Sequence, residues 1–204
     1  MDKKQLINNL LLDLAQDASM NKVMLMAQAI SFELYNDLFS DWVKKEQRGY
    51  YNCKQEEIPL YREFPCGLKV DIFLPYRGIV TNYMIPQDII KERLAKDFLS
   101  SVKLPQSLAE LEHIKSKNED SELQLGVPAS IFPYINQSLD DGEVQRATRV
   151  VSAAAPSAII NCVKAKLLDF FSYMTKSIDL DSDFQDEGIQ CKLNELFNKY
   201  IWNE

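Results

Sequence analysis

Residues 41–62 read Asp-Trp-Val-Lys-Lys-Glu-Gln-Arg-Gly-Tyr, then Tyr-Asn-Cys-Lys-Gln-Glu-Glu, and then Ile-Pro-Leu-Tyr-Arg. The first part continues an apolar stripe at helical spacing, which predicts a helix over residues 37–48. Gly49 can then end this helix, because glycine takes the left-handed conformation that a C-cap needs. From residue 61 onward the apolar period changes from helical to alternating. The stretch therefore marks the switch from a helical N-terminal third to a sheet.

Helical spacing of apolar residues also precedes this stretch, over residues 6–14 and 23–34. After it, residues 68–74 alternate between apolar and polar side chains, as in a half-buried strand. Residues 78–84 follow across a turn at 75–77. The two segments are expected to pair as a hairpin.

Helices return after the hairpin. Residues 87–98 regain helical spacing, and a Ser-x-x-Glu capping box of Ser107 and Glu110 predicts a helix over residues 108–117. Pro156 suits the first turn of the longest helix, which reaches about residue 178. Shorter expected elements are a strand at 123–127, a helix at 128–137 and a strand at 144–152. The predicted fold class is α+β, with helical ends around a small, mainly antiparallel sheet.

The end of the chain is expected to form a separate segment. Residues 179–187 carry five acidic side chains and no basic one, which indicates a solvated linker. We therefore expect one domain at 1–178, able to fold alone, and an acidic linker with an amphipathic helix at 179–204. The helix is expected to serve self-association or partner docking, or to fold back on its own domain. Its apolar stripe consists of Ile189, Leu193, Leu196, Phe197, Tyr200 and Ile201.

Composition limits the classes of function. With 46% hydrophobic and 26% charged residues among 204, the chain can bury a substantial core. The net charge of -7 opposes a broad basic face, so nucleic acid is not favoured as a generic ligand. The most apolar run, residues 150–163, is shorter than the roughly 20 residues that span a bilayer, and the N-terminus does not have the pattern of a secretory signal. We expect a cytoplasmic protein without membrane insertion.

The sequence offers few candidates for chemistry. The four cysteines are far apart and the chain has one histidine, so no metal site is expected and free thiols are favoured. Residues 179–183 resemble the opening of a calcium loop, but Phe184 and Gln190 replace the glycine and glutamate that an EF-hand requires. No phosphate-binding or nucleophile-elbow motif occurs, and we expect no cofactor. His113, flanked by acids, is either a general base or a surface residue.

Several blocks resemble the AbiTii family, a domain of bacterial abortive-infection and antiphage loci. Within residues 41–62, Trp, Glu, Gly and Tyr match the end of a family helix, and Pro-x-Tyr-Arg follows in order. Two features depart from the family pattern: residues 164–166 read Lys-Ala-Lys where an Arg-Asn-Arg-like run is expected, and 179–204 have no counterpart. The resemblance implies an antiphage context and no particular reaction. The later matching blocks are Ile85-Pro86, Ser107–Glu112 and Leu167–Phe170.

One cluster within this signature is the best candidate site. In the structural interpretation, Arg62 forms a salt bridge to Glu46 that locks the helix at 37–48 to the first strand, with aromatic rings packed around it. In the functional alternative, Arg62 and Arg77 bind a phosphate or an acidic partner. The candidate residues are Trp42, Glu46, Tyr50, Tyr61, Arg62 and Arg77.

The leading functional hypothesis is a component of an antiphage system that acts through protein contacts, as a sensor, adaptor or oligomerising module. Its partner would be another protein or further copies of the chain. One alternative is a toxin enzyme acting on nucleic acid or nucleotide. The other is an antitoxin-like partner that masks a toxin, which the acidic charge fits. No sequence motif points to catalysis, so an enzyme is not the leading interpretation.

Overall fold

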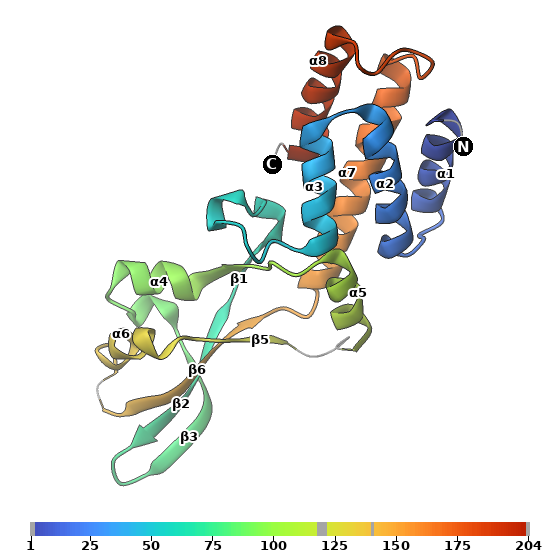
Figure 1. Ribbon diagram of the computed structural model, residues 1–204. Helices are drawn as coiled ribbons and strands as arrows, with labels where there is room; N and C mark the ends of the chain where they lie inside the picture. The colour runs from blue at the N-terminus through green and yellow to red at the C-terminus, as the bar shows by residue number, and fades with distance from the viewer. Residues whose placement is uncertain (1–2, 118–121, 140, 203–204) are drawn as a thin grey trace. The chain divides into compact units, whose positions relative to one another are not determined.

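The computed structural model describes residues 3–117, 122–139 and 141–202 (Figure 1). These residues form two compact units. The helical unit contains residues 3–61, 105–117 and 156–202, and the sheet unit contains the rest. The predicted α+β class is confirmed, because helices begin and end the chain and the strands, which pair antiparallel, lie between them in sequence. Within the described ranges, no helix combines the length and apolar character needed to cross a membrane.

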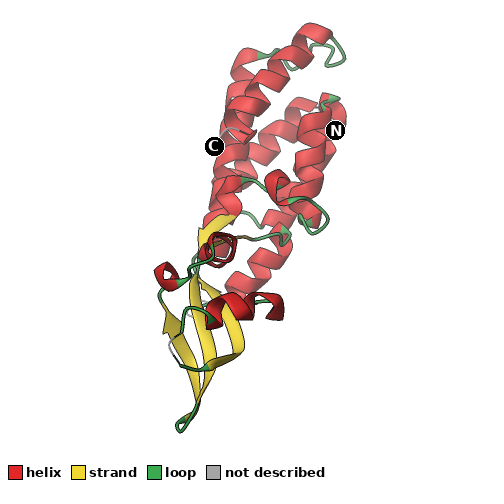
Figure 2. Cartoon of the chain, turned by 90° about the vertical axis from the view of Figure 1, so that its left-hand side faces the viewer, coloured by secondary structure: helices red, strands yellow, loops and turns green. Residues whose placement is uncertain are grey.

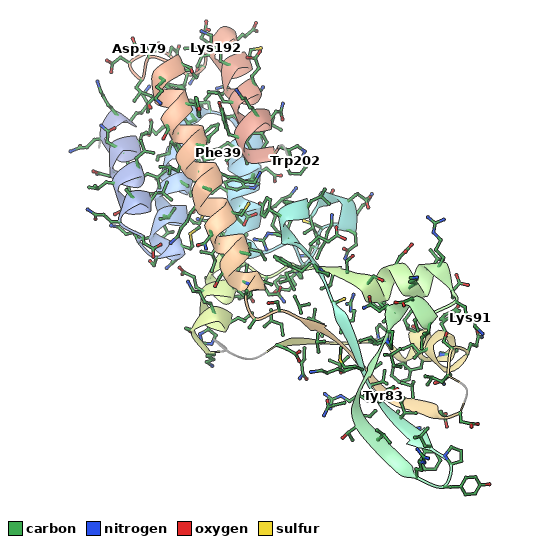
Figure 3. All side chains as sticks on the ribbon, turned by 180° about the vertical axis from the view of Figure 1, so that it is seen from behind. Phe39, Tyr83, Lys91, Asp179, Lys192 and Trp202 are labelled. Atoms are coloured by element: carbon green, nitrogen blue, oxygen red, sulfur yellow. The ribbon has the colours of Figure 1, made fainter. Side chains whose placement is uncertain are left out.

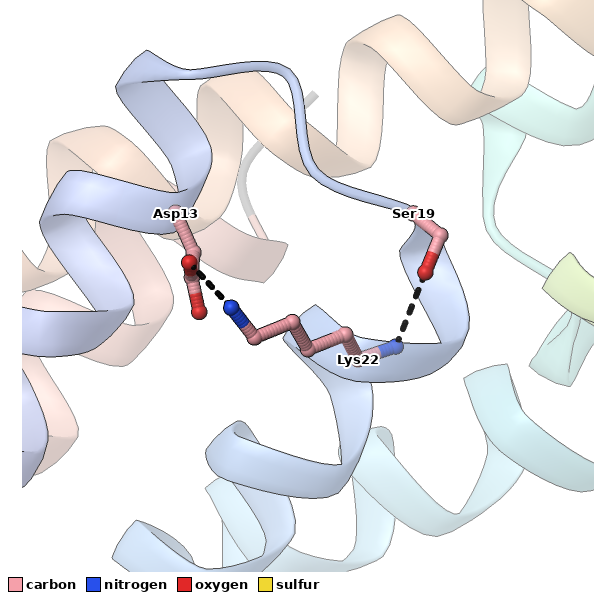
Figure 4. Close-up of polar contacts among 3 residues, drawn as sticks. All are labelled: Asp13, Ser19 and Lys22. Atoms are coloured by element: carbon pink, nitrogen blue, oxygen red, sulfur yellow. Dashed lines mark hydrogen bonds and ion pairs between the residues drawn. The ribbon is translucent and has the colours of Figure 1, made fainter.

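The helical unit begins with an antiparallel pair of helices that a cap and an ion pair hold in place (Figure 4). The Ser19 side chain accepts a hydrogen bond from the Lys22 backbone N–H at 3.5 Å, and Lys22 Nζ lies 2.6 Å from Asp13 Oδ1. Asn36 caps the next helix in the same way, through the Phe39 N–H at 2.9 Å. The elements are α1 (Lys3–Ala15), α2 (Met20–Leu34), α3 (Asp37–Arg48), η1 (Gln55–Glu57), α5 (Leu108–Lys117), α7 (Ala155–Ser177), α8 (Glu187–Leu196) and the π-helical η5 (Phe197–Trp202).

Aromatic rings form the centre of the helical unit. Phe39 of α3 stacks on Phe170 of α7 with 4.9 Å between ring centroids, and it meets Phe171 edge-on at 5.6 Å. All three rings are fully buried. Figure 3 shows Phe39 among the helices, against α7. Such pairs stabilise a core by about 0.5–1.5 kcal/mol beyond the area they bury, so α3 and α7 are firmly joined here.

The sheet unit contains a four-stranded antiparallel sheet in the order β3-β2-β6-β5 and a separate pair, β1-β4. The predicted hairpin at 68–84 is confirmed, with Phe73 opposite Ile79 and Leu74 opposite Gly78. The strands are β1 (Glu63–Pro65), β2 (Gly67–Leu74), β3 (Gly78–Ile85), β4 (Ser101–Lys103), β5 (Leu123–Gly126) and β6 (Glu143–Val151). The helical elements are η3 (Gln87–Ile89), α4 (Arg93–Ser100), η4 (Ala129–Ile131) and α6 (Phe132–Asn136).

The core of the sheet unit lies on one face of this sheet. Leu68, Val70 and Ile72 of β2 are buried there together with Leu99 of α4 and Ile135 of α6. Figure 2 shows the short helices beside the strands of this unit. The intervening residues of β2 point to the opposite face, where Phe73 is exposed. The alternation in the sequence therefore sorts the two faces as predicted.

Three local predictions differ from the structure. The helix expected at 87–98 is split, because Ile90 and Glu92 are extended and Glu92 caps α4 through the Leu94 N–H. The helix expected at 128–137 is likewise divided into η4 and α6. Gly49 does take a positive φ of 83°, but its ψ of 171° is extended rather than left-handed helical. Only a residue without a side chain fits this turn, since a Cβ would lie 2.7 Å from the Pro105 carbonyl oxygen.

Candidate functional site

A buried carboxylate, that of Glu46, lies at the centre of the predicted cluster. Its Oε1 atom accepts hydrogen bonds from the Tyr50 hydroxyl at 2.7 Å and from the Tyr61 hydroxyl at 2.5 Å. The indole Nε1 of Trp42 donates to the Tyr61 hydroxyl oxygen at 3.1 Å. Glu46 is fully buried, and Trp42 and Tyr50 are nearly so. The structure therefore brings these four predicted residues together within the helical unit.

Helical spacing explains how the cluster forms. Trp42 and Glu46 are four residues apart in α3 and so share one face, and Tyr50 continues that spacing just beyond the helix. The Tyr50 backbone N–H donates to the Pro105 carbonyl at 2.7 Å, which fixes the chain after Gly49. Tyr61 belongs to the 3-10 helix η2 (Leu60–Arg62). The network thus ties the turn at residue 61 to α3.

Helix α7 adds a lysine and a thiol to the same region. Lys166 Nζ lies 5.2 Å from the Tyr61 ring centroid and donates to the Ile201 carbonyl at 2.8 Å. Burial raises the pKa of the Cys162 thiol, while Lys166 acts to lower it and Glu46 to raise it further. Because the net effect is a raised pKa, Cys162 is a protonated thiol at neutral pH and a poor nucleophile.

The contacts of Glu46 are those that a buried carboxylate requires. A buried carboxylate needs hydrogen-bond donors, and Glu46 receives two on one oxygen. Hydrogen bonds to an ionised group are short and about twice as strong as neutral ones. Since Glu46 has no exposed surface, a substrate in solvent does not reach its carboxylate. The network instead stabilises the path of the chain from α3 to η2.

Arg62 lies in the sheet unit and is also fully buried. Its Nη1 donates to the Leu104 carbonyl at 3.0 Å, and its own carbonyl accepts from the Leu104 N–H at 2.9 Å. These contacts continue the pairing of β1 with β4 by one residue, because Arg62 precedes β1 and Leu104 follows β4. Because Glu46 belongs to the other unit, the salt bridge from Arg62 to Glu46 stays a prediction.

Arg77 lies in the turn between β2 and β3. Arg62 precedes β2 and Arg77 follows it, so a strand of eight residues, about 25 Å long, lies between the two residues in the chain. Arg77 is exposed and borders two open cavities of about 550 and 540 Å³, both of which Asp141 also lines. Tyr83 and Ile89 also line the cavity of about 550 Å³. The predicted anion site of Arg62 with Arg77 stays a prediction.

The terminal amphipathic helix packs on the helical unit through its apolar stripe. Leu193, Phe197 and Ile201 are buried, whereas Ile189, Leu196 and Tyr200 are half-buried. Tyr200 stacks on Tyr173 of α7 with 4.5 Å between centroids. The expected use of this stripe in self-association stays a prediction.

The acidic segment before this helix is anchored as well. The acidic side chains of residues 179–187 are exposed, as the solvated linker predicts, but Leu180 and Phe184 are buried between them. The Gln190 side chain donates to the Leu34 and Phe184 carbonyls at 2.8 and 2.6 Å. Residues 179–202 therefore belong to the helical unit, while the predicted domain boundary at 178 stays a prediction.

The β2–β3 hairpin carries exposed apolar residues that were not predicted from the sequence. We call these residues the hairpin patch. Figure 3 shows one member, Tyr83, on this hairpin. The signal was present in β2, because the alternation that buries Ile72 turns Phe73 outward beside Lys69 and Asp71. The hairpin patch consists of Phe73, Tyr76, Ile79, Tyr83 and Met84, which are exposed residues on both faces of the hairpin. Ile79 and Met84 pair with Phe73 and Lys69 on the outer face, Tyr83 pairs with the buried Val70 on the other, and Tyr76 lies at the turn.

The other candidate groups are engaged in the fold or lie on the surface. His113 is exposed on α5, and its neighbour Glu110 accepts from the Ser107 N–H at 2.7 Å as the predicted capping box requires. Glu112 accepts from the Met20 N–H at 2.7 Å. Among the residues that the structure describes, no three His, Cys, Asp or Glu side chains gather as metal ligands.

Comparison with known proteins gives one match. The family model described as AbiTii matches residues 5–188, which is most of the 204-residue chain. No curated protein and no solved structure gives a significant match. The matched range covers the buried Glu46 network, the hairpin patch and the start of α8.

Proposed function

Because the chain belongs to the AbiTii family, we propose that it serves abortive infection by contacting another protein chain rather than by catalysing a reaction. The family links the chain to antiphage defence. A contact role requires a surface that is apolar, exposed and carried on a formed element of structure. The hairpin patch meets these requirements.

The observation that carries the proposal is the exposure of the hairpin patch. Tyr76 at the turn is fully exposed, and Ile79 keeps 62% of its surface in contact with solvent. Phe73 lies directly opposite Ile79 in the strand register. Apolar side chains gathered in the open on one element are costly to leave in water and are typical of interaction sites on proteins. Aromatic residues and methionine are also enriched at such interfaces.

The state of the candidate catalytic groups supports the same proposal. Glu46 is buried and hydrogen-bonded to two tyrosines. Burial raises the pKa of both the Cys66 and the Cys162 thiols, which keeps them protonated at neutral pH. These groups serve the fold, and this supports a contact role over a toxin enzyme.

A phage-challenge assay of the intact locus tests the proposal. Deleting the gene should restore plaque formation for at least one phage of a broad panel. An Ile79→Lys variant should restore it equally, because a lysine in the hairpin patch prevents an apolar contact, while the protein stays folded and expressed.

Leu94→Lys is the matched control, because Leu94 is 78% exposed on α4 and belongs to the same unit. This variant should protect like the wild type. Equal plating with and without the gene would overturn the defence role. Full protection by Ile79→Lys would instead overturn the hairpin patch as the contact surface.

A further inference from the structure

Strand β3 is a long open edge of the sheet. It stands first in the order β3-β2-β6-β5, so β2 is its one neighbour among the described strands of that sheet. It runs for eight residues, Gly78–Ile85, and contains neither a charged residue nor a proline. Proteins usually protect edge strands by making them short, by placing charges or proline on them, or by adding a bulge. Here the one such feature is a bulge, because Thr81 and Asn82 lie opposite the single residue Asp71. Asn82 has a φ of 55°, and its N–H donates to Asp71 Oδ1 at 2.8 Å.

The side chains along this edge are apolar and exposed. Ile79, Tyr83 and Met84 each keep more than half of their surface in solvent. Val80, Tyr83 and Ile89 all line the cavity of about 550 Å³. A strand added along β3 would pair with its backbone and contact these side chains at the same time.

Charge indicates which chain can occupy the edge. The protein carries a net charge of -7, so two copies repel each other on approach. Contact through β3 adds no like-charge pair within the strand itself, because no residue of β3 is charged. Arg77 directly precedes the strand, and Asp88 follows it in η3. Both are exposed, and neither side chain has an ion pair or hydrogen bond within the described ranges.

We propose that β3 pairs antiparallel with β3 of a second copy of this chain. Two-fold symmetry then places the Arg77 end of each strand beside the Asp88 end of the other, so the same opposite-charge contact forms twice. The sheets of the two copies join into one continuous sheet. The inference deepens the contact role proposed above and rests on it for biological meaning, whereas its test is independent of phage.

The experiment measures molar mass by light scattering over a concentration series, with far-UV circular dichroism to confirm folding. The wild type should reach twice the chain mass of 23.5 kDa. Arg77→Glu and Asp88→Lys should each give monomers, because each places like charges together. The double variant Arg77→Glu/Asp88→Lys should regain the dimer, because it restores opposite charges in exchanged positions. Arg93→Glu, a charge reversal at an exposed site on α4, should remain dimeric.

Several outcomes would overturn the proposal. These are a wild type that stays monomeric up to about 1 mM, dimers that persist in both single variants, and a double variant that does not regain the dimer. Amide exchange gives a second readout, since exchange within residues 79–84 should slow as wild-type concentration rises, and not in Arg77→Glu. Equal exchange at all concentrations in a dimeric wild type would place the interface elsewhere. A dimer without phage protection would leave this inference intact and count against the defence role alone.

Discussion

The Tyr61 hydroxyl donates to Glu46 Oε1 across 2.5 Å and accepts from Trp42 Nε1 across 3.1 Å. Tyr61 therefore joins two side chains of α3 that lie one helical turn apart. Both partners are almost completely buried. In such a low-dielectric setting a satisfied network rigidifies the structure, and a missing member leaves costly unpaired groups.

Tyr61→Phe should destabilise the protein by about 1–3 kcal/mol, because it removes one donor from Glu46 and the acceptor of the Trp42 indole N–H. Urea unfolding followed by circular dichroism measures this change. Tyr51→Phe is the matched control, since the Tyr51 hydroxyl binds Glu110 at the surface and its loss should cost less than about 0.5 kcal/mol. Equal stability of the two variants would show that the network does not hold η2. A stable Tyr61→Phe protein without phage protection would indicate a functional role instead.

Gly49→Ala should destabilise the turn after α3, because the added Cβ would lie 2.7 Å from the Pro105 carbonyl oxygen at a φ of 83°. The expected cost is roughly 1 kcal/mol or more. Gly126→Ala provides the control, since its Cβ would meet no atom within 4 Å. A drop in the midpoint of thermal unfolding for Gly49→Ala alone is expected. Similar midpoints for both variants would show that the backbone shifts to accept a side chain at residue 49.

The capping box of α5 should make stability depend on pH. Hydrogen bonds from the backbone and then the hydroxyl of Ser107 lower the pKa of Glu110 from its ordinary value of 4.5. Because the pKa of Glu110 is lower in the folded state, its ionised form stabilises the protein fully above pH 4.5. This contribution is lost as the pH falls through the pKa of the folded state. The stability difference between wild type and Glu110→Gln should therefore shrink on acidification below pH 4.5. Ser107→Ala should raise the Glu110 pKa in an NMR titration, and an unchanged pKa would contradict the assigned cause.

Local patterns predicted much of this fold because their causes are local. The helices at 37–48 and 108–117 match α3 and α5, since apolar spacing together with a cap or a stopping glycine defines a helix from nearby residues. The hairpin followed from alternation around a turn. The break before α4 was missed, because Ile90 is buried in an extended segment where tertiary packing overrides helical spacing.

The candidate site was predicted in part. Trp42, Glu46 and Tyr50 share a helical face, so their meeting could be expected from spacing alone. One hydrogen-bond partner of Arg62 is the Leu104 carbonyl, 42 residues away, which no local pattern specifies. The alternation in β2 predicts that Phe73 points away from the core. Whether another element covers that face is not encoded in a local pattern, so the exposure of the hairpin patch could not be predicted. Local sequence patterns therefore do not specify which distant residues come into contact.

Burial of the terminal helix gives the last prediction. The sequence suggests that residues 1–178 fold without the tail, yet Leu193, Phe197 and Ile201 are buried in the helical unit. Phe197→Ala should therefore cost about 3–5 kcal/mol in urea unfolding. Trp202→Ala is the control, because Trp202 is 48% exposed whereas Phe197 is 4% exposed, and its cost should be much smaller.

Deletion of residues 179–204 should likewise lower the midpoint of thermal unfolding. It removes the buried side chains of the tail and exposes Tyr173, on which Tyr200 stacks. Differential scanning calorimetry of the truncated and full-length proteins measures this change. A truncated protein that melts with the full-length chain would show that the tail is only docked and that the boundary at 178 is real. If the folded single variants lose stability but keep the oligomeric mass of the wild type, the tail belongs to the core of the helical unit. Self-association would then use another surface.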